Sequence, residues 1–525
     1  MLFITDQHRA DYLGCYGHPV LRTPHIDSIA ARGVAFDRFY VASPVCMPNR
    51  ASLMTGRMPS VHGVRSNGIP LSRRSVTFVD LLREAGYRTA LVGKSHLQNF
   101  TGNAPLAKPR VPAQGYRSPP PSLAQAIRND LHSADYDQEQ PDYWQSKDAR
   151  IRTPFYGFDH VELVRGHGDT VTGDYTGWLL AREPDALHML GPENALPHDY
   201  VCPQAHRTRI PAELYSTAYI AERVAAYLDR QASQDDDAPF FLMVSFPDPH
   251  HPFNPPGKYW DMYRPEQFAV PQAFTRNDWT PPKHVQEVID ARARGAANLK
   301  GMRSIGTTAR EAQEAQALTC GMIACIDDAI GGVLGALDKG GRADDTVVMF
   351  TTDHGDHLGD HRLLLKGAEQ YQSIVRVPFI WSDPQAPQAA GRTGAIASTL
   401  DIPATILDRA QLEPYYGLQG RSLLPSIAGS DDGREAAFIQ YDHQLAGQPP
   451  DMGLRVHTLV DARWRISVVH GSDDGELYDL VADPGEFDNL WASPEHMKVR
   501  GELMERLARI EIAHIDRVPV PTQQA

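Results

Sequence analysis

Cys46, Pro48 and Arg50 form a Cys-x-Pro-x-Arg string that could carry a nucleophile. Residues 34–40 before it read as a strand, and the run from Arg50 onward predicts a helix that Gly56 ends. The first turn of a helix offers unpaired backbone N–H groups and the positive end of the helix dipole, so an anion binds there readily. Arg50 can reach the same anion. A cysteine beside prolines is more often a small buried apolar side chain, so the prediction depends on other residues.

Asp6 and the pair Asp353-His354 are the candidate metal ligands. Each follows a short apolar run that predicts a strand, at 2–5 and 345–352. Ligands gather at the carboxyl ends of the strands in parallel sheets. Carboxylates with one imidazole suit Ca²⁺ or Mn²⁺ better than a structural zinc, which prefers thiolates. The alternatives are a turn or capping role for Asp6 and a solvated polar loop after residue 352.

Strand and helix patterns alternate along the part of the chain that would position these residues. Strands are predicted at 2–5, 34–40, 89–92, 239–246 and 345–352, and helices at 24–32, 77–85, 212–230 and 313–337. This order is typical of an α/β fold with a large, mainly parallel sheet flanked by helices. Lys94 and His96 follow the third of these strands, so their side chains can enter the same cleft as Cys46. A lone Lys or His is more often on the surface or in a satisfied core.

The 525 residues exceed what one compact core usually holds, so a large domain with a smaller one is expected. We predict a catalytic α/β domain at 1–429. Short runs joined by turns, and a last helical pattern, predict a C-terminal α+β domain at 430–525 with an antiparallel sheet and a packed helix. Within the first domain, residues 100–210 contain many prolines and an acidic stretch, which predicts an irregular surface insertion near the mouth of the site.

Composition limits the classes of partner. The net charge of −14 argues against nucleic-acid binding, although a local group of basic residues and a metal can still attract an anion. No run of about 18 apolar residues predicts a membrane span. The five cysteines have no regular spacing, and no basic leader precedes the first strand, so a cytoplasmic location is expected.

Together these motifs resemble the sulfatase family of the alkaline-phosphatase superfamily. The resemblance runs over nearly the whole length, from Thr-Asp-Gln-His at 5–8 to Leu-Tyr-Asp-Leu-Val-Ala-Asp-Pro-Gly-Glu at 477–486. In that family the cysteine of Cys-x-Pro-x-Arg is oxidised after translation to formylglycine, whose hydrated aldehyde is the nucleophile. The resemblance implies one divalent cation, Ca²⁺ ahead of Mn²⁺, held by Asp6, Asp353, His354 and the modified Cys46.

The resemblance also implies roles for the basic residues. Arg50 lies beside the nucleophile, and Lys94 and Lys366 bind the sulfate oxygens. His96 contacts the formylglycine hydroxyl, and His250 protonates the leaving oxygen. These residues would complete a site that recognises a tetrahedral anion.

Several positions indicate which branch of the family the chain resembles. Gln7 and His354 stand where many sulfatases have a second acidic residue and an Asn, a pattern similar to the phosphonate monoester hydrolase and choline sulfatase branches. Asn67, 21 residues after Cys46, resembles a substrate-contacting Asn of the phosphonate hydrolases. Against this, Gly-Lys-Ser-His at 93–96 matches the Gly-Lys-x-His of ordinary sulfatases, which phosphonate hydrolases lack. The sulfatase interpretation is the stronger one.

The main prediction is metal-dependent hydrolysis of sulfate monoesters through a formylglycine derived from Cys46. A phosphonate monoester or phosphodiester hydrolase on the same scaffold is the first alternative, and a catalytically silent anion-binding protein with unmodified Cys46 is the second. The expected partners are a small-molecule sulfate ester and a formylglycine-generating enzyme. The sequence leaves open the organic group of the ester and the subunit number, a homo-oligomer included.

Overall fold

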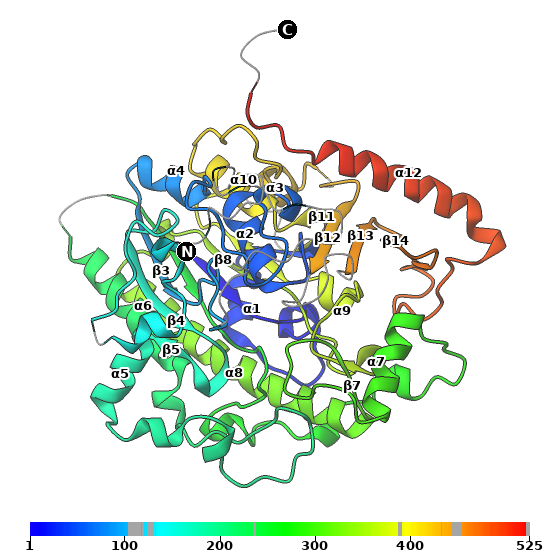
Figure 1. Cartoon of the computed structure of the whole chain (residues 1–525). Helices are drawn as coiled ribbons and strands as arrows, with labels where there is room; N and C mark the ends of the chain where they lie inside the picture. The colour runs from blue at the N-terminus through cyan, green and yellow to red at the C-terminus, as the bar shows by residue number, and fades with distance from the viewer. Residues whose placement is uncertain are drawn as a thin grey trace.

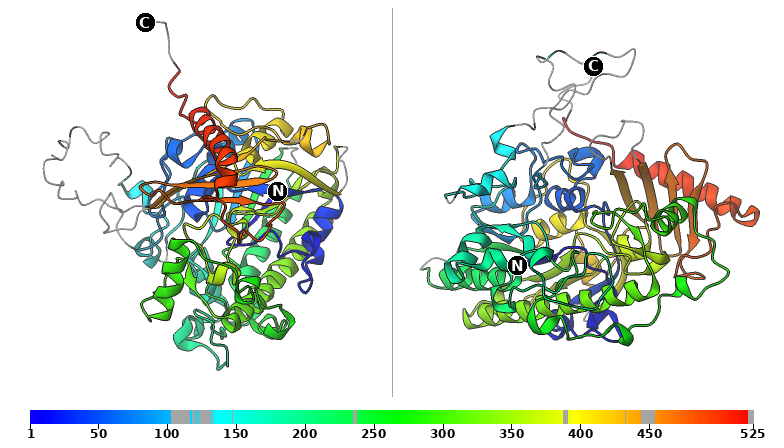
Figure 2. Two further views of the ribbon diagram at one scale, coloured as in Figure 1. Left: turned by 90° about the vertical axis from the view of Figure 1, so that its right-hand side faces the viewer. Right: turned by 60° about the horizontal axis from the view of Figure 1, so that its bottom comes forward.

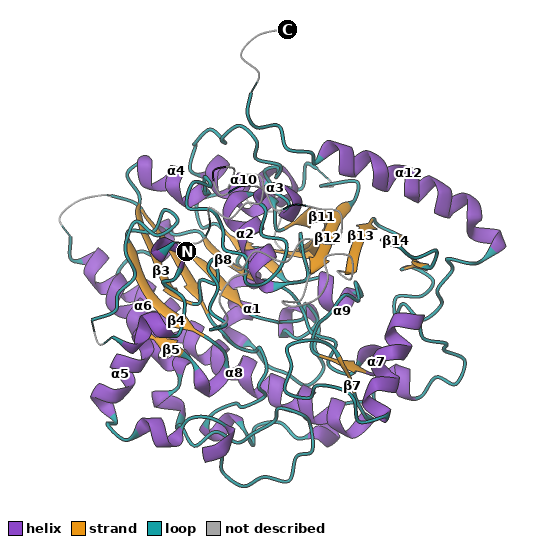
Figure 3. Cartoon of the chain, in the orientation of Figure 1, coloured by secondary structure: helices purple, strands orange, loops and turns teal. Residues whose placement is uncertain are grey.

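A large sheet runs through the centre of the protein (Figures 1 and 3). The computed structural model describes residues 1–102, 117, 120, 122, 131, 133–146, 148–234, 238–386, 391–431, 433–443 and 454–520. Within these residues, nine strands pair in the order β11-β2-β10-β8-β1-β6-β3-β4-β5. Their bounds are β1 Leu2–Thr5, β2 Val34–Tyr40, β3 Arg88–Gly93, β4 His160–Arg165, β5 Thr172–Gly173, β6 Phe240–Ser245, β8 Val348–Thr352, β10 Phe379–Ser382 and β11 Gly391–Ser398.

The centre of this sheet is parallel. Strands β8, β1, β6, β3 and β4 all run in the same direction, and β11 is parallel to β2. Strand β10 is antiparallel to both of its neighbours, and β5 is antiparallel to β4. The predicted fold class, a mainly parallel sheet flanked by helices, is confirmed. Because parallel strands end at the same edge, residues that follow β1, β3, β6 and β8 converge there.

Helices cover both faces of the sheet because side chains alternate along each strand. Leu2 and Ile4 pack in a cluster with residues of α2, α4 and α10, whereas Phe3 packs with residues of α1, α5, α6 and α8. Full burial of a side chain such as Phe3 contributes about 2 kcal/mol. The helices are α1 Pro24–Ala31, α2 Cys46–Thr55, α3 Pro59–His62, α4 Phe78–Glu84, α5 Asp174–Arg182, α6 Ser216–Ala232, α7 Lys283–Ala293, α8 Ala309–Lys339, α9 Gln372–Val375, α10 Asp401–Arg409 and α11 Leu424–Ile427.

Helix α8 is long and apolar enough to cross a membrane by length and composition alone. Most of its apolar window is nevertheless buried inside the protein, where Ile326, Ile330 and Val333 pack against the sheet and its neighbouring helices. A core helix of a globular protein passes the same test, and this is the role that α8 has here.

A second, smaller sheet follows in the C-terminal region. Strands β12 Ala437–His443, β13 Leu454–Val460, β14 Trp464–Val469 and β15 Gly475–Asp479 are antiparallel neighbours in that order, and α12 Met497–Ala513 lies beside them (Figure 2). Leu503 and Leu507 of α12 pack in one cluster with residues of these strands and with Ala42, Met58 and Leu400 of the larger part. The antiparallel sheet with a packed helix matches the predicted C-terminal α+β region. A further two-stranded sheet pairs β7 Ile305–Gly306 with β9 Leu363–Leu364.

The structure corrects two expectations. Residues 100–210 are not irregular throughout, because β4, β5 and α5 lie within them and β4 pairs with β3 of the main sheet. Strand β4 lies near the sheet edge, where its first residues are half-buried, so it lacks the continuous apolar run of a central strand. Much of the proline-rich part, 103–116 included, falls outside the described residues. Helix α2 begins at Cys46 instead of Arg50, since Pro48 is tolerated in a first helical turn.

Candidate active site

The strands of the main sheet bring the candidate residues to one edge. Asp6 directly follows β1, Asp353 follows β8 and Lys94 follows β3. Gly93, at the end of β3, has a φ of +111°, and a side chain there would collide with the backbone oxygen of Ser245 in β6. Glycine therefore lets the two strand ends approach, and the Lys94 amide donates to that oxygen at 2.9 Å.

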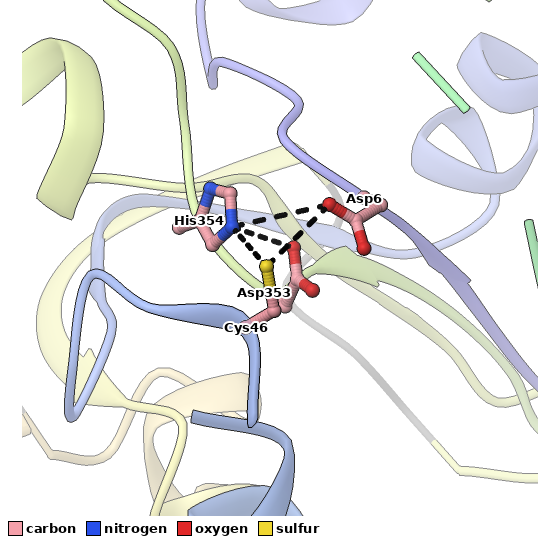
Figure 4. Close-up of side chains that lie close together, drawn as sticks. All are labelled: Asp6, Cys46, Asp353 and His354. Carbon is pink, nitrogen blue, oxygen red and sulfur yellow. Dashed lines mark hydrogen bonds and ion pairs between the residues drawn. The ribbon is translucent and has the colours of Figure 1, made fainter. Parts of the chain in front are cut away.

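Asp6, Cys46, Asp353 and His354 point towards a common centre (Figure 4). Their potential ligand atoms all lie within 4.8 Å of one another, and all four residues are buried. The Nε2 atom of His354 is 3.0 Å from Sγ of Cys46, 3.9 Å from Oδ1 of Asp6 and 3.7 Å from Oδ1 of Asp353. The structure thus brings together the four residues predicted to hold a metal.

The protonation of this group suits a divalent cation. His354 donates from Nδ1 to the backbone oxygen of the next residue at 3.0 Å, which leaves an unprotonated Nε2 facing the centre. Burial, and to a smaller extent the positive charge of Lys366, lowers the pKa of His354 to about 4, so its ring is neutral. Burial acts to raise the pKa of Asp6, but the ammonium of Lys94 and the other nearby cations hold it well below its usual range. Two carboxylates, one imidazole and an oxygen at position 46 would fit Ca²⁺ or Mn²⁺.

Arg50 fixes the two carboxylates from the opposite side. Its Nε donates to Oδ2 of Asp353 at 2.7 Å, and its Nη2 donates to Oδ2 of Asp6 at 3.3 Å. A further bond from Nη1 to Oγ of Ser245, at 3.0 Å, ties the guanidinium to the end of β6. Because Arg50 binds the Oδ2 atoms, the Oδ1 atoms of both carboxylates remain directed at the centre.

Cys46 is the first residue of α2 and is only 1% exposed. Burial, and then the negative charge of Asp6, raises the pKa of its thiol to about 11. The unmodified thiol is therefore protonated at neutral pH and is a poor nucleophile. Its Sγ atom marks the place that an oxygen of the hydrated formylglycine would take.

Two lysines lie beside this centre, each in contact with a histidine. Lys94 Nζ forms an ion pair with Oδ2 of Asp6 and lies 2.7 Å from Nε2 of His167. Lys366 Nζ donates to Oε1 of Gln7 at 2.5 Å and lies 2.7 Å from Nε2 of His250. Both lysines are buried, so their charges can act on an anion with little screening by water.

His96 is a buried histidine whose ring nitrogens can bind a ligand. It is 2% exposed, and neither of its ring nitrogens has a hydrogen-bond partner among the described residues. Its ring stacks on Phe100 with the centroids 3.9 Å apart. Burial, and then the charge of Lys94, holds the pKa of His96 well below its usual range. A neutral imidazole can accept or donate one hydrogen bond to a hydroxyl.

Asn67 lies beside the start of α2. Its Oδ1 accepts a hydrogen bond from the backbone amide of Met47 at 3.1 Å, and the residue is half-buried. The structure therefore places Asn67 next to the predicted nucleophile. Its amide nitrogen can face a ligand at the same helix end.

Comparison with known proteins identifies the family. The family model described as "Sulfatase" matches residues 1–412, which is most of the chain. The chain belongs to the sulfatase family. A second model, "N-sulphoglucosamine sulphohydrolase, C-terminal", matches residues 359–513 of this sulfatase.

Individual relatives of the sulfatase extend over the full length. It is 28% identical to the "Multifunctional alkaline phosphatase superfamily protein PehA" of Trinickia caryophylli, covering 98% of this chain and 96% of the relative. It is 26% identical to the arylsulfatase of Clostridium perfringens, covering 98% and 94%. Among solved structures, the phosphonate monoester hydrolase of Agrobacterium radiobacter matches with a TM-score of 0.77 and 26% identity, covering 100% of this chain and 97% of that one. The family and its alkaline-phosphatase superfamily fold agree with the resemblance stated from the motifs.

Sequence reasoning missed several residues that shape the site of this sulfatase. Glu139, in the expected insertion, accepts hydrogen bonds from the backbone amides of residues 96, 97 and 98 at 2.9 to 3.0 Å and so holds the loop that carries His96. His167 follows β4 and contacts Lys94. The sequence marked Gln7 only as a sign of the family branch, whereas in the structure it has a φ of +61° and binds Lys366. No spacing motif marks Glu139 or His167; only the position of His167 just after a strand could have indicated it.

Proposed function

We propose that this sulfatase hydrolyses sulfate monoesters through a formylglycine formed from Cys46. The observation that carries the proposal is the convergence of Cys46, at the start of a helix, with Asp6, Asp353 and His354. Lys94 and Lys366 flank the same point, as a site for a tetrahedral anion requires.

Different residues of the chain carry out different steps of the reaction. The ammonium groups of Lys94 and Lys366 bind equatorial oxygens of the sulfate. One hydroxyl of the hydrated aldehyde at position 46 releases its proton to water and forms a bond to sulfur, and the bond from sulfur to the ester oxygen breaks. Nε2 of His250 takes a proton from the Lys366 ammonium, which lies 2.7 Å away, and passes it to the leaving oxygen.

The second half of the reaction regenerates the aldehyde. His96 accepts the proton of the remaining hydroxyl at position 46, and the carbon–oxygen double bond forms as the bond from that carbon to the sulfate oxygen breaks. Sulfate leaves, and water adds to the aldehyde to restore the hydrate. An unmodified cysteine or serine has no second hydroxyl on that carbon, so it could not expel the sulfate in this way.

Ca²⁺ is our proposal for the cation, with Mn²⁺ as the alternative. Asp6, Asp353, His354 and the oxygen at position 46 would hold it. When bound, such an ion lowers the pKa of a hydroxyl that it contacts and stabilises negative charge on the sulfate oxygens. The hard carboxylate oxygens favour Ca²⁺, whereas the imidazole is also compatible with Mn²⁺.

Two measurements test the function. The mass of the peptide spanning residues 43–57, from protein made with a formylglycine-generating enzyme, should be about 18 Da below the cysteine form. The converted protein should hydrolyse 4-nitrophenyl sulfate, and the variant Cys46→Ala should not. Full conversion without any hydrolase activity, or an unconverted peptide from the native host, would support the silent anion-binding alternative.

Phosphonate monoester or phosphodiester hydrolysis is the second candidate. Gln7 in place of an acidic residue, and the similarity to a solved phosphonate monoester hydrolase, favour it. Lys94 in the Gly-Lys-Ser-His stretch favours the sulfatase activity. Rates on paired phenyl sulfate and phenyl phosphonate substrates separate the two, and a much faster phosphonate reaction would reverse our ranking.

We also propose a cytoplasmic location for this sulfatase. In support, the cysteines at 15, 46, 202, 320 and 325 are all free thiols in the structure, as is usual in a reducing compartment. Maturation would then require a formylglycine-generating enzyme in that compartment. Fractionation of the native host tests this proposal.

A further inference from the structure

Six residues of the site form a closed ring of contacts. Asp6 pairs with Lys94, Lys94 contacts His167, His167 stacks on His250, His250 contacts Lys366, and Lys366 binds Gln7. Asp6 and Gln7 are neighbours in the chain, so the ring closes through one peptide bond. His167 and Gln7 are the members without a role in the proposed reaction, and His167 links Lys94 to His250, which in turn contacts Lys366.

His167 anchors Lys94 on one side. Its Nε2 lies 2.7 Å from Nζ of Lys94, and the ammonium can only donate, so the imidazole accepts. Burial, and then the charge of Lys94, keeps the pKa of His167 well below its usual range, which agrees with a neutral acceptor. Lys94 thus has two anchors, Asp6 and His167, and retains a third N–H for a ligand. Without His167, the ammonium would be held by Asp6 alone.

The ring of His167 also packs against one face of the His250 ring. The two rings are stacked, with centroids 3.6 Å apart and planes at 11°. The other face of His250 is covered by His251, at 4.0 Å and 27°. His250 donates from Nδ1 to the backbone oxygen of His251 at 2.5 Å, which directs Nε2 towards Lys366. The ring of His250 is therefore clamped on both faces and cannot turn freely.

We propose that His167 is a positioning residue with two separable roles. Its Nε2 holds the Lys94 ammonium in place to bind the anion, and its ring face holds His250 in place to protonate the leaving oxygen. The proposal rests on the proposed function. The ligand atoms of Asp6, His167 and His250 lie within 4.8 Å of one another, so both roles act at a single point of the site.

Two variants of the converted enzyme separate the roles. His167→Phe keeps an aromatic face but cannot accept from Lys94, whereas His167→Gln keeps an acceptor but loses the face. For His167→Phe we expect the inhibition constant of inorganic sulfate to rise about tenfold to hundredfold, the usual effect of losing a hydrogen bond to a charged group. For His167→Gln we expect that constant to stay within about threefold of the wild-type value, because the amide oxygen replaces the acceptor.

The dependence on the leaving group gives the second readout. 4-Nitrophenol leaves without much need of a proton, but phenol requires one, so the rate ratio of 4-nitrophenyl to phenyl sulfate reports on the acid. His167→Gln should raise this ratio about tenfold or more, because the His250 ring loses the aromatic ring that packs on one of its faces and is held less firmly. His167→Phe should leave the ratio close to that of the wild type.

Matched controls come from β4, the strand that precedes His167. His160 begins β4, is half-buried and pairs with Glu162 at 3.0 Å, away from the site. His160→Phe and His160→Gln should change neither readout. Conversion of Cys46 is checked by peptide mass in every variant, and sulfate binding is also measured by calorimetry.

The outcomes distinguish a failure of the positioning roles of His167 from a failure of the proposed function. The proposal is supported if only His167→Phe raises the inhibition constant of sulfate and only His167→Gln raises the rate ratio of 4-nitrophenyl to phenyl sulfate. A parallel loss of both properties in both variants, or no change in either, overturns the positioning roles while the wild-type enzyme still hydrolyses sulfate esters. A converted wild type that neither hydrolyses sulfate esters nor binds sulfate overturns the proposed function and this inference with it.

Discussion

Nε2 of His354 lies 3.0 Å from Sγ of Cys46, although the two residues are separated by 308 positions in the chain. One residue follows the end of a central strand and the other begins a helix. This contact joins the predicted nucleophile to the predicted metal ligands. Conversion of Cys46 to formylglycine would therefore change the group that the His354 ring contacts.

The thiol of unconverted Cys46 should be almost unreactive at neutral pH. Because burial and Asp6 raise its pKa to about 11, the thiolate fraction at pH 8 is on the order of one in a thousand. Alkylation by iodoacetamide, followed by peptide mass spectrometry, should be slow at pH 8 and should accelerate steeply up to pH 11. The urea-unfolded protein is the control, since its thiols alkylate readily at pH 8. Rapid labelling of the folded protein at pH 7 would contradict this arrangement.

Replacing Arg50 with Met should cost stability as well as activity. Arg50 is buried and donates to both Asp6 and Asp353. Its removal leaves the buried carboxylate of Asp353 without a cationic partner and Asp6 with Lys94 alone, at a cost of about 3–5 kcal/mol in the free energy of unfolding. Added Ca²⁺ should restore more stability to the variant than to the wild type, because a cation replaces part of the lost charge. Urea unfolding with and without Ca²⁺ measures both effects.

The control for Arg50 is the exposed Arg83, which pairs with the exposed Asp159. Arg83→Met should cost less than about 1 kcal/mol, as exposed ion pairs usually do. Equal losses from the two substitutions would argue against a special role for the buried arginine.

Glu139→Gln should displace His96 and slow catalysis. The carboxylate of Glu139 accepts three backbone hydrogen bonds, and an amide can accept with its oxygen only, so its NH₂ group would face a backbone N–H. We expect kcat to fall about tenfold to hundredfold, the cost of a lost charge-assisted hydrogen bond in the site. Steady-state kinetics on 4-nitrophenyl sulfate measures it. Asp142→Asn, in an exposed part of the same segment, should leave kcat unchanged; an equal loss there would point to general destabilisation.

His361 should make the protein less stable in mild acid. Its ring is buried against Tyr371, with centroids 3.6 Å apart, and burial lowers its pKa from 6.5 to about 4. Between those values the unfolded chain binds the proton more strongly than the folded protein, so stability falls as the pH drops from about 6.5 to about 4. His361→Gln removes the pH-dependent contribution of this imidazole to the free energy of unfolding. Relative to the wild type, the free energy of unfolding of the variant should therefore rise on the order of 3 kcal/mol from pH 7 to pH 4.

Urea unfolding at several pH values measures the effect of His361. The exposed His470 provides the control, and His470→Gln should follow the wild type at every pH. A constant difference between His361→Gln and the wild type from pH 7 to pH 4 would show that the imidazole does not titrate as its burial implies.

The sequence by itself determined the parts of this sulfatase that depend on local pattern. The alternation of strand and helix patterns predicted a mainly parallel sheet, and the positions of Asp6 and Asp353 just after two strands predicted that these residues meet at its carboxyl edge. This succeeds because strand periodicity and helix ends are set by nearby residues, and parallel topology then fixes where the strand ends meet. The same reasoning missed β4, whose half-buried edge position weakens the apolar pattern.

Only the tertiary structure decided which other side chains meet at the centre. Glu139 reaches the loop of His96, and His167 lies between Lys94 and His250, across separations in the chain that no spacing rule constrains. A buried polar residue takes its partner from the packing of distant elements, because it must satisfy its hydrogen bonds with the groups that the fold places beside it. Residue type and local pattern therefore located the chemistry, while the packing of the sheet and its loops determined how that chemistry is held in position.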